Sequence, residues 1–392
     1  MTNEATSFSF SRPMYVMLKP VGARCNLSCD YCYYLDRGLH TGPVMDEPLL
    51  ETFTRQYLEA QTTPEVLFTW HGGEPLLRGI DFYRRALALQ RQYGRGRQID
   101  NCLQTNGTLL DDAWCEFFRE NNFLIGISID GPQPFHDTYR HSGSSFGDAS
   151  SLRRESSFDA VMRGIELLKK HGVAWNAMAT VNAANVGEPV VFYRFFRDID
   201  CEFLQFTPVV EPGRPECSVT ADVWGRFLCA VYDEWVRRDV GRLFVQLFDA
   251  TLANWCGEPP GVCSMAPTCG QAAVMEADGT VYSCDHFVGS AYRLGNIRQQ
   301  TLTELLYGDR QRQFGLDKLR LPRQCRECCW RFACHGECPK NRHATDRYGE
   351  PGLNVLCAGY RQFFAHVAAD MDFMKGEIDA GRAPANIMAR QQ

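Results

Sequence analysis

Short apolar runs alternate with longer stretches of helical spacing through the first half of the chain. The runs are rich in β-branched and aromatic residues, and Gly, Asn or Pro follow several of them, which is typical of strands that end in turns. Six runs predict strands: Tyr15–Lys19, Val66–Trp70, Cys102–Thr105, Ile125–Ile129, Trp175–Val181 and Phe203–Pro208. Because strand and helix alternate, we expect a parallel sheet covered by helices, in an α/β barrel of six units.

Residues Phe158–His171 have the clearest helical pattern between these runs. Val161, Ile165 and Leu168 recur at a spacing that places them on one face. Basic residues close the segment and Gly172 follows it, which is a usual end for a helix.

The pattern changes beyond a second long helical stretch that begins near Asp222. The segment Cys256–Cys357 is rich in cysteine, glycine and proline and shows little periodicity. Such a segment buries little apolar surface, so we expect it to fold around metal. We therefore divide the chain into a barrel (1–235), a cysteine-rich domain (236–375) and a tail (376–392).

Eighteen cysteines make the composition unusual, whereas the net charge of −6 gives no reason to expect a nucleic-acid partner. The first twenty residues lack the basic start and apolar centre of a signal peptide, and no apolar run reaches the roughly 18 residues of a membrane span. We expect a cytoplasmic protein without a membrane partner. In that reducing compartment, the cysteines favour metal binding, under anaerobic conditions if the metal is iron–sulfur.

Cys25, Cys29 and Cys32 form a CxxxCxxC motif shortly after the first strand. A cubane iron–sulfur cluster needs four ligands, so three thiolates leave one iron open. In radical S-adenosylmethionine (SAM) enzymes, that iron binds the amino and carboxylate groups of SAM. A structural zinc loop is the alternative, but zinc normally takes four protein ligands.

Further polar residues follow the second and fourth strands. Gly73 lies in the GGEP turn, where glycine lets the backbone approach a ligand, and Glu74 can accept a hydrogen bond from an ammonium group. Ser128 and Asp130 offer a hydroxyl and a carboxylate to a ribose where α/β sheets bind ligands. The alternative is that Ser128 and Asp130 cap the next segment.

Five other residues near these motifs have candidate roles. Arg140 can meet the SAM carboxylate or lie in solvent, and Tyr31 can pack against adenine or shield the cluster. Peptide contacts are expected from strand ends, at His71, Gln104 and Asn106.

Eight cysteines in the second half have ligand-like spacing, which is the number that two fully ligated clusters require. They are Cys263, Cys269, Cys284, Cys325, Cys328, Cys334, Cys338 and Cys357. Two zinc ribbons are the alternative. Cys329, next to Cys328, is left out with less certainty than the other remaining cysteines.

These motifs together resemble the anaerobic sulfatase-maturating enzymes, which are radical SAM enzymes with a cysteine-rich SPASM extension. The resemblance rests on CNLSCDYCYY, TWHGGEPL, QTNGTL, SIDGP, FLQFTPVVE and VYSCDHF, in that order over nearly the whole chain. It implies a partial (β/α)6 radical SAM barrel followed by a SPASM domain with two auxiliary [4Fe–4S] clusters, three clusters in all. His71 departs from the family pattern, since some relatives carry Gln there.

The resemblance also assigns roles by position. The SAM-cluster ligands are Cys25, Cys29 and Cys32, and the SAM contacts are Tyr31, Gly73, Ser128, Arg140 and Leu204. The first auxiliary cluster takes Cys263, Cys269, Cys284 and Cys338, and the second takes Cys325, Cys328, Cys334 and Cys357. Asp285 matches the catalytic base. We expect nearby cluster charge to raise the pKa of Asp285.

The implied reaction oxidises an active-site Cys or Ser of a sulfatase to Cα-formylglycine. The implied partners are a sulfatase polypeptide with a Cys/Ser-x-Pro-x-Arg motif and a low-potential electron donor such as ferredoxin or flavodoxin. Two alternatives stay open at this point. One is a SPASM enzyme that forms thioether or carbon–carbon cross-links in a peptide, and the other is an iron–sulfur protein that only transfers electrons.

Overall fold

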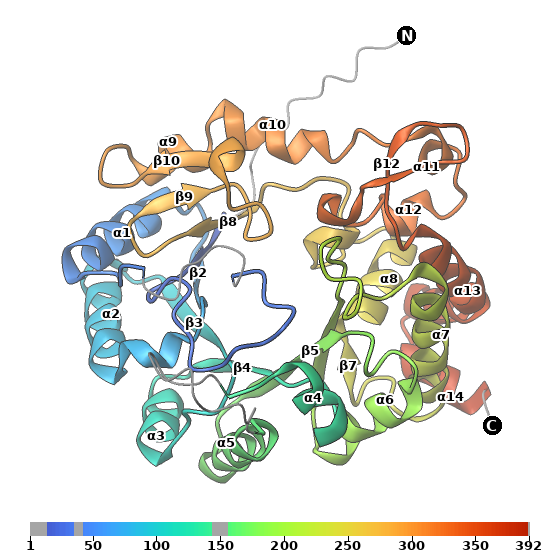
Figure 1. Ribbon diagram of the computed structural model, residues 1–392, viewed down its shortest axis with the longest axis horizontal. Coiled ribbons are helices and arrows are strands. Elements are labelled where there is room, and N and C mark those ends of the chain that lie inside the picture. The colour runs from blue at the N-terminus through green and yellow to red at the C-terminus, as the bar shows by residue number, and fades with distance from the viewer. Residues whose placement is uncertain (1–13, 35–41, 143–155, 391–392) are drawn as a thin grey trace.

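The six predicted strands form one continuous parallel sheet. The computed structural model describes residues 14–34, 42–142 and 156–390 (Figure 1). The strands are β1 (Tyr15–Leu18), β2 (Glu65–Trp70), β3 (Gln98–Thr105), β4 (Leu124–Ser128), β5 (Trp175–Val181) and β6 (Phe203–Pro208). Their order in the sheet is their order in the chain, and each neighbouring pair is parallel. The strand predictions are confirmed.

Helices follow the strands and cover the outer face of the curved sheet, as Figure 1 shows. They are α1 (Glu47–Ala60), α2 (Ile80–Tyr93), α3 (Asp112–Glu120), α4 (Gln133–Tyr139), α5 (Phe158–His171), α6 (Pro189–Asp198) and α7 (Ala221–Arg238). Within the described residues, the sheet order runs from β10 (Arg293–Asn296) to β7 (Phe244–Val245) without closing on itself. The architecture is therefore a partial barrel, as expected.

The predicted helix Phe158–His171 is α5, with the predicted bounds and end. Val161, Ile165 and Leu168 are buried against the sheet. Gly172 adopts the left-handed conformation at φ 65°, and its N–H donates to the carbonyl of Leu168. This backbone conformation costs glycine little, so the helix ends where the sequence places a glycine.

The cysteine-rich region differs from the expectation, because its first part joins the apolar core. β8 (Ala272–Met275) pairs in parallel with β1, and β9 (Thr280–Tyr282) and β10 continue the sheet antiparallel. Val274, Met275 and Val281 are fully buried. Short strands and a single parallel pairing give little periodicity, so the sequence pattern did not reveal them.

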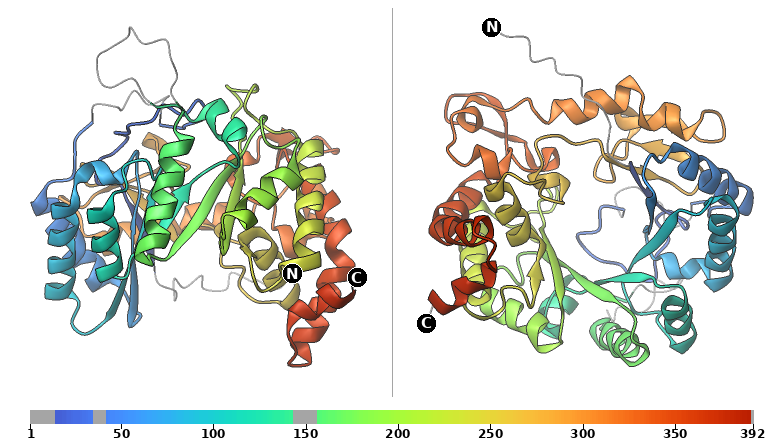
Figure 2. Two further views of the ribbon diagram at one scale, coloured as in Figure 1. Left: turned by 90° about the horizontal axis from the view of Figure 1, so that it is seen from below. Right: turned by 180° about the vertical axis from the view of Figure 1, so that it is seen from behind.

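The last long helix joins the end of the chain to the barrel. α13 (Cys357–Asp379) lies against α7, as Figures 1 and 2 both show. The helices cross at Gly225 and Gly359, where a Cβ on Gly359 would lie 2.2 Å from the carbonyl oxygen of Ala221. Glycine at the crossing lets the two backbones approach closely.

Short elements make up the rest of the second half. They are α8 (Gln246–Cys256), α9 (Leu302–Leu306), α10 (Asp309–Asp317), α11 (Arg323–Arg326), α12 (Arg331–Cys334), β11 (Ala344–Thr345), β12 (Pro351–Leu353) and α14 (Ile387–Arg390). The 3-10 turns are η2 (Pro75–Arg78), η3 (Cys263–Met265), η4 (Ser290–Tyr292), η5 (Pro339–Asn341) and η6 (Pro384–Asn386). None of the helices described is long and apolar enough to cross a membrane. The division into 1–235, 236–375 and 376–392 remains our proposal, with both internal boundaries inside helices, α7 and α13.

Candidate active site

A cavity opens at the carboxyl ends of the barrel strands, where α/β barrels bind their ligands. Figure 1 shows the loop after β1 inside the ring of strands. The cavity is lined by this loop, by residues that end β2 to β6, and by three side chains from the second half of the chain: Asp285, His286 and Lys340.

The CxxxCxxC loop brings its three thiols to one wall of this cavity. Burial and the nearby Glu74 carboxylate raise the pKa of Cys25 to about 12, and burial also raises the pKa of Cys29. The Cys32 thiolate further raises the pKa of Cys25, and the thiolates of Cys25 and Cys32 raise that of Cys29, so the three groups are close together. A bound cation removes this cost, because thiolates are stabilised by metal.

The donor set matches a cluster better than a single ion. Among the described residues, no three His, Cys, Asp or Glu side chains are arranged to hold one metal ion. A cubane cluster spreads its thiolate ligands over different irons, so they need not converge on one point. Three thiols on one loop therefore suit an iron–sulfur cluster.

Asp130 is hydrogen-bonded to this loop through Tyr31 and does not line the cavity. It is fully buried, and Arg140 binds it through Nε at 2.9 Å and Nη2 at 3.2 Å. It also accepts hydrogen bonds from the Thr180 N–H at 2.8 Å and the Tyr31 hydroxyl. The expectation that Asp130 binds a ribose is wrong, because its oxygens are occupied inside the protein. Arg140, Tyr31 and Ser128 do line the cavity.

Glu74 also differs from its expected place. It is fully buried, and it accepts hydrogen bonds from Thr105 Oγ1 at 2.8 Å, the Leu76 N–H at 2.9 Å and the Asn106 N–H at 2.8 Å. Burial raises its pKa to about 7 in spite of these donors. The carboxylate joins the loops after β2 and β3, and the cavity is lined by Gly73 beside it.

Leu204 is the second predicted SAM contact that lies elsewhere. It is buried near the start of β6, opposite Ala177 of β5, and it lines a separate hollow at the other end of the strands. Thr207 and Pro208 are the β6 residues that line the cavity. A residue so far before the end of a strand lies below the ligand, because the chain rises about 3.3 Å per residue.

Asp285 reaches the cavity from the loop after β9 and pairs with a buried lysine. Lys19 Nζ lies 2.8 Å from Asp285 Oδ1, and the Tyr33 hydroxyl donates to Oδ2 at 2.8 Å. Lys19 also lies 3.2 Å from the Tyr33 hydroxyl and 3.2 Å from Nδ1 of His71. The Asp285 side chain is 16% exposed and Lys19 is not exposed, so only the carboxylate opens to the cavity.

The neighbours of Asp285 act against its burial. Burial raises its pKa, but the Lys19 ammonium, with smaller contributions from His71 and His286, leaves the pKa well below its usual range, and the effect of bound cluster charge stays a prediction. Lys19 and Tyr33 were missed in the sequence. Lys19 is the last residue of the first apolar run, at the strand end that faces ligands, and that position was the available signal.

The eight cysteines of the second half form two groups in space. Thiolate charges interact within the group Cys263, Cys269, Cys284 and Cys338, and within the group Cys325, Cys328, Cys334 and Cys357. The structure brings together the same two sets that the resemblance implied. Cys338 departs from its neighbours in sequence and joins the first set.

Two cations lie near these groups: Lys318 is buried beside the first group, and the partly buried Arg342 interacts with cysteines of both. Lys318 is 1% exposed, and its Nζ donates to the carbonyl of Cys263 at 2.6 Å. Arg342 donates to the carbonyls of Gly336 at 2.8 Å and Lys318 at 2.7 Å. These charges offset those of nearby thiolates, so the surroundings suit anionic clusters. No sequence motif marked Lys318 or Arg342.

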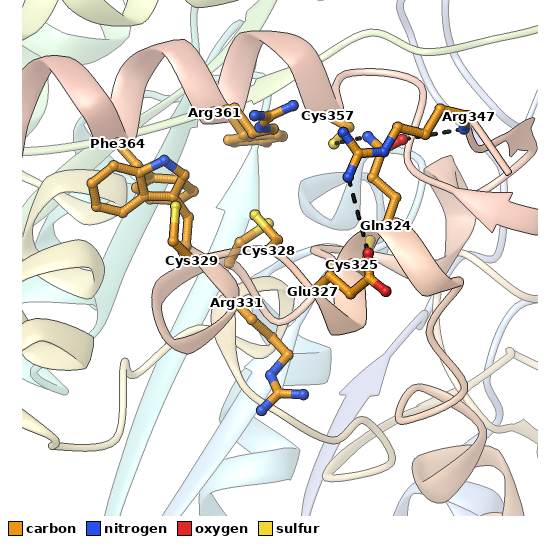
Figure 3. A pocket seen from close by; sticks show the side chains of 14 residues that line it. Gln324, Cys325, Glu327, Cys328, Cys329, Arg331, Arg347, Cys357, Arg361 and Phe364 are labelled. Atoms are coloured by element: carbon orange, nitrogen blue, oxygen red, sulfur yellow. Dashed lines mark hydrogen bonds and ion pairs between the residues drawn. The ribbon is translucent and has the colours of Figure 1, made fainter.

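The second group lines a pocket of its own (Figure 3). Cys325, Cys328 and Cys357 reach it from different elements, and Cys329 and Phe364 also line it. Cys329 is exposed and lines the same pocket. Its exclusion from the ligand set stays a prediction.

Comparisons with known proteins agree with this geometry. The model of the radical SAM superfamily matches residues 20–196, and that of the SPASM iron–sulfur cluster-binding domain matches residues 263–329. The serine-type anaerobic sulfatase-maturating enzyme of Bacteroides thetaiotaomicron is 55% identical over 98% of this chain and 97% of that protein. The chain belongs to the anaerobic sulfatase-maturating enzymes. The cysteine-type enzyme of Clostridium perfringens strain 13 is 32% identical over 90% of this chain and 96% of its own length.

Solved structures place this family member among radical SAM folds. Native anSMEcpe with bound AdoMet and Cp18Cys peptide has a TM-score of 0.84 at 30% identity, covering 94% of this chain and all of that one. SuiB from Streptococcus suis, bound to S-adenosylmethionine, has a TM-score of 0.60 at 15% identity, covering 88% of this chain and 77% of that one. At that identity SuiB shares the fold alone.

Proposed function

We propose that this chain oxidises an active-site serine or cysteine of a sulfatase to Cα-formylglycine. The observation that carries the proposal is the convergence of two remote segments on one cavity. The CxxxCxxC loop after β1 forms one wall, and Asp285, held by Lys19, forms another. The family supports this reaction over electron transfer alone, and the cross-linking alternative rests only on a shared fold.

Three [4Fe–4S] clusters and SAM are the cofactors. Bound SAM and its cluster supply hydrogen-atom abstraction, and the auxiliary clusters supply electron acceptance. We propose that Cys25, Cys29 and Cys32 hold the first cluster. The two groups of four cysteines in the second half hold the others, because thiols that gather in such numbers suit [4Fe–4S] ligation.

The SAM contacts that we retain are those on the cavity wall: Tyr31, Gly73, Ser128 and Arg140. Gly73 has a steric role, since a Cβ there would lie 2.1 Å from the carbonyl oxygen of Arg24 and would separate the GGEP turn from the cysteine loop. Arg140 is held by Asp130 with its guanidinium 5.5 Å from the centre of the Tyr31 ring. It is therefore positioned before a ligand arrives.

In the oxidation, the side chains of the protein itself remove the proton. Converting a –CH2OH or –CH2SH group to an aldehyde or thioaldehyde removes one hydrogen atom, one electron and one proton. Asp285 is ionised, faces the cavity and is held by Lys19 and Tyr33, so it is placed to accept the proton from the hydroxyl or thiol. A thioaldehyde then needs water to give the aldehyde.

Serine is the preferred target residue in our proposal. The Bacteroides relative, at 55% identity, is a serine-type enzyme, whereas the Clostridium perfringens relative, at 32%, is a cysteine-type enzyme. The substrate is then a sulfatase segment with Ser-x-Pro-x-Arg, and Cys-x-Pro-x-Arg is the poorer alternative.

The second cysteine group suggests where an electron carrier docks. Its pocket is lined by Arg331, Arg347 and Arg361, with Arg347 4.0 Å from Glu327 (Figure 3). A basic rim around a cluster suits an acidic, low-potential carrier such as ferredoxin or flavodoxin. All eighteen cysteines are free, which suits a reducing cytoplasm.

The test is a peptide assay on protein reconstituted without oxygen. SAM, a strong reductant and a Ser-x-Pro-x-Arg or Cys-x-Pro-x-Arg peptide are added, and the peptide is weighed. We expect the mass of an aldehyde, matched by 5′-deoxyadenosine. Cleavage of SAM with no change in either peptide would contradict the proposed substrate, and no cleavage by fully iron-loaded protein would contradict the radical SAM chemistry.

A further inference from the structure

A histidine on the cavity wall has its ring hydrogen fixed by its neighbours. Nδ1 of His71 lies 2.7 Å from the backbone nitrogen of Gly72 and 3.2 Å from Nζ of Lys19. A backbone N–H and an ammonium group can only donate, so Nδ1 must be the acceptor. The hydrogen of the neutral ring therefore lies on Nε2.

The ring is neutral at physiological pH and turns a donor toward the cavity. Burial and the Lys19 ammonium lower the pKa of His71 to about 3. His71 lines the cavity, and within the described part of the chain no protein group bonds to Nε2. An entering group that can accept a hydrogen bond meets this N–H.

Asp285 offers the complementary atom on the same wall. Its carboxylate accepts hydrogen bonds and faces the same cavity. Lys19 contacts both side chains, at 2.8 Å from Asp285 Oδ1 and 3.2 Å from His71 Nδ1. One buried ammonium thus contacts both the acceptor and the donor side chain.

We propose that Lys19 is a positioning residue that sets His71 and Asp285 as a donor and acceptor pair for the hydroxyl of a substrate serine. The hydroxyl donates its hydrogen to Asp285 while its oxygen accepts from His71 Nε2–H. A thiol gains less from the same pair, because sulfur is a weak donor and a weak acceptor. This inference rests on the proposed function and assigns its serine preference to three residues.

The arrangement accounts for the hydrogen atom, the proton and the electron that the oxidation removes. The hydrogen atom leaves Cβ by the chemistry that SAM supplies, the hydroxyl proton passes to Asp285, and the last electron passes to an oxidised iron–sulfur cluster. The C–O single bond becomes a C=O double bond, and its oxygen still accepts from His71. The donor therefore acts on the oxygen from substrate to product.

The experiment is a competition between Ser and Cys peptides of otherwise identical sequence, with kcat/KM measured for each in one reaction. The ratio of the two values does not depend on the fraction of correctly folded enzyme. The variants are His71→Leu, His71→Gln and Lys19→Met, on the cluster-loaded protein. His366→Leu is the matched control, since His366 is exposed and pairs with Asp233 on the outer surface.

We expect His71→Leu to lower the Ser to Cys ratio about 10-fold, which is the size of one lost hydrogen bond. His71→Gln restores an N–H donor and recovers most of the ratio. Lys19→Met lowers the ratio and also the yield of aldehyde per SAM cleaved, and the control leaves both unchanged.

Three results with His71→Leu would overturn the inference: an unchanged ratio, an equal loss with both peptides, or a loss of SAM cleavage. The second would mean a role that does not depend on oxygen, and the third would place His71 with SAM. If the Lys19→Met variant unfolds, the result with His71→Leu still tests the donor role of His71, because His71→Leu keeps the Lys19–Asp285 pair. If the wild-type protein makes no aldehyde from either peptide, the proposed function fails instead.

Discussion

The barrel and the cysteine-rich region position their functional residues in different ways. In the barrel, the loops and side chains of the cavity are attached to the ends of parallel strands with a fully buried core. In residues 320–357, the cysteines lie on the one-turn helices α11 and α12, in turns, and at the first residue of α13. The difference indicates that the SAM cavity is held by packing, whereas the second cysteine group depends on what its thiols bind.

Asp285 shows how the two regions meet. Its loop follows β9, and β9 pairs with β8, which pairs with β1. The catalytic candidate from the cysteine-rich region is thus anchored to the barrel sheet, next to Lys19 of β1's carboxyl end. The cavity therefore contains residues from both regions, and its proposed proton acceptor, Asp285, comes from the cysteine-rich one.

Removal of iron should give the largest difference between the barrel and the cysteine-rich region. We expect residues 320–357 to lose amide protection by orders of magnitude when the clusters are removed anaerobically, since metal binding supplies much of the folding energy of such segments. The strands β1 to β6 should change far less. Hydrogen exchange followed by mass spectrometry measures both, and equal loss in the two regions would contradict the distinction.

Asp285→Asn should separate SAM cleavage from peptide oxidation. The amide cannot accept the substrate proton as a carboxylate does, so aldehyde formation should fall by about 100-fold or more. SAM cleavage should persist, because the residues proposed to bind SAM are unchanged. Aldehyde and 5′-deoxyadenosine are measured together, and wild-type aldehyde yield would remove Asp285 from the mechanism.

Glu74→Gln should lower the stability of the barrel without changing the binding of SAM. The amide of the new Gln side chain would turn its own N–H toward one of the groups that now donate a hydrogen bond to the carboxylate. Two donors that face each other form no hydrogen bond, and this loss costs about 2 kcal/mol in the free energy of unfolding. Urea denaturation measures this loss. SAM affinity below the unfolding transition should be unchanged, and a large drop in it would restore Glu74 as a SAM contact.

Gly359→Ala should have the smallest effect, at the joint between the two regions. The added methyl group would overlap the Ala221 carbonyl, and separating α13 from α7 to make room should cost about 1 kcal/mol. Thermal unfolding measures it, with Gly376→Ala as the control, since a Cβ at Gly376 has no neighbour within 4 Å. Equal shifts for both variants would argue against close packing at this crossing.

Sequence patterns predicted the local features of this fold well. The six predicted strands formed, several of them ending near a turn residue, and α5 ended at its glycine, because these outcomes depend on propensity and spacing within a few residues. The strands β8 to β10 were missed. They are three or four residues long, and the pairing that joins them to the barrel, β8 with β1, is remote in the chain.

The candidate site divides in the same way. Cysteine spacing identified the eleven thiols, and the family resemblance divided eight of them into the two sets that the structure gathers. The resemblance also placed Ser128, Arg140 and Gly73 at the cavity. Spacing could not distinguish a side chain that faces the cavity from one turned into the protein. Glu74 and Asp130 were therefore assigned to ligands although both are fully buried.

The sequence by itself determined the barrel, the family and the chemistry of the cysteines, because periodicity and motif spacing are local properties of the chain. Only the tertiary structure decided the charge environment of the base. Lys19, His71 and Asp285 are far apart in sequence, yet they share a buried network. Lys19 and His71 follow the carboxyl ends of the neighbouring parallel strands β1 and β2, and Asp285 comes from the loop after β9 of the same sheet. A pKa depends on such neighbours and on burial, and neither can be read from the chain alone.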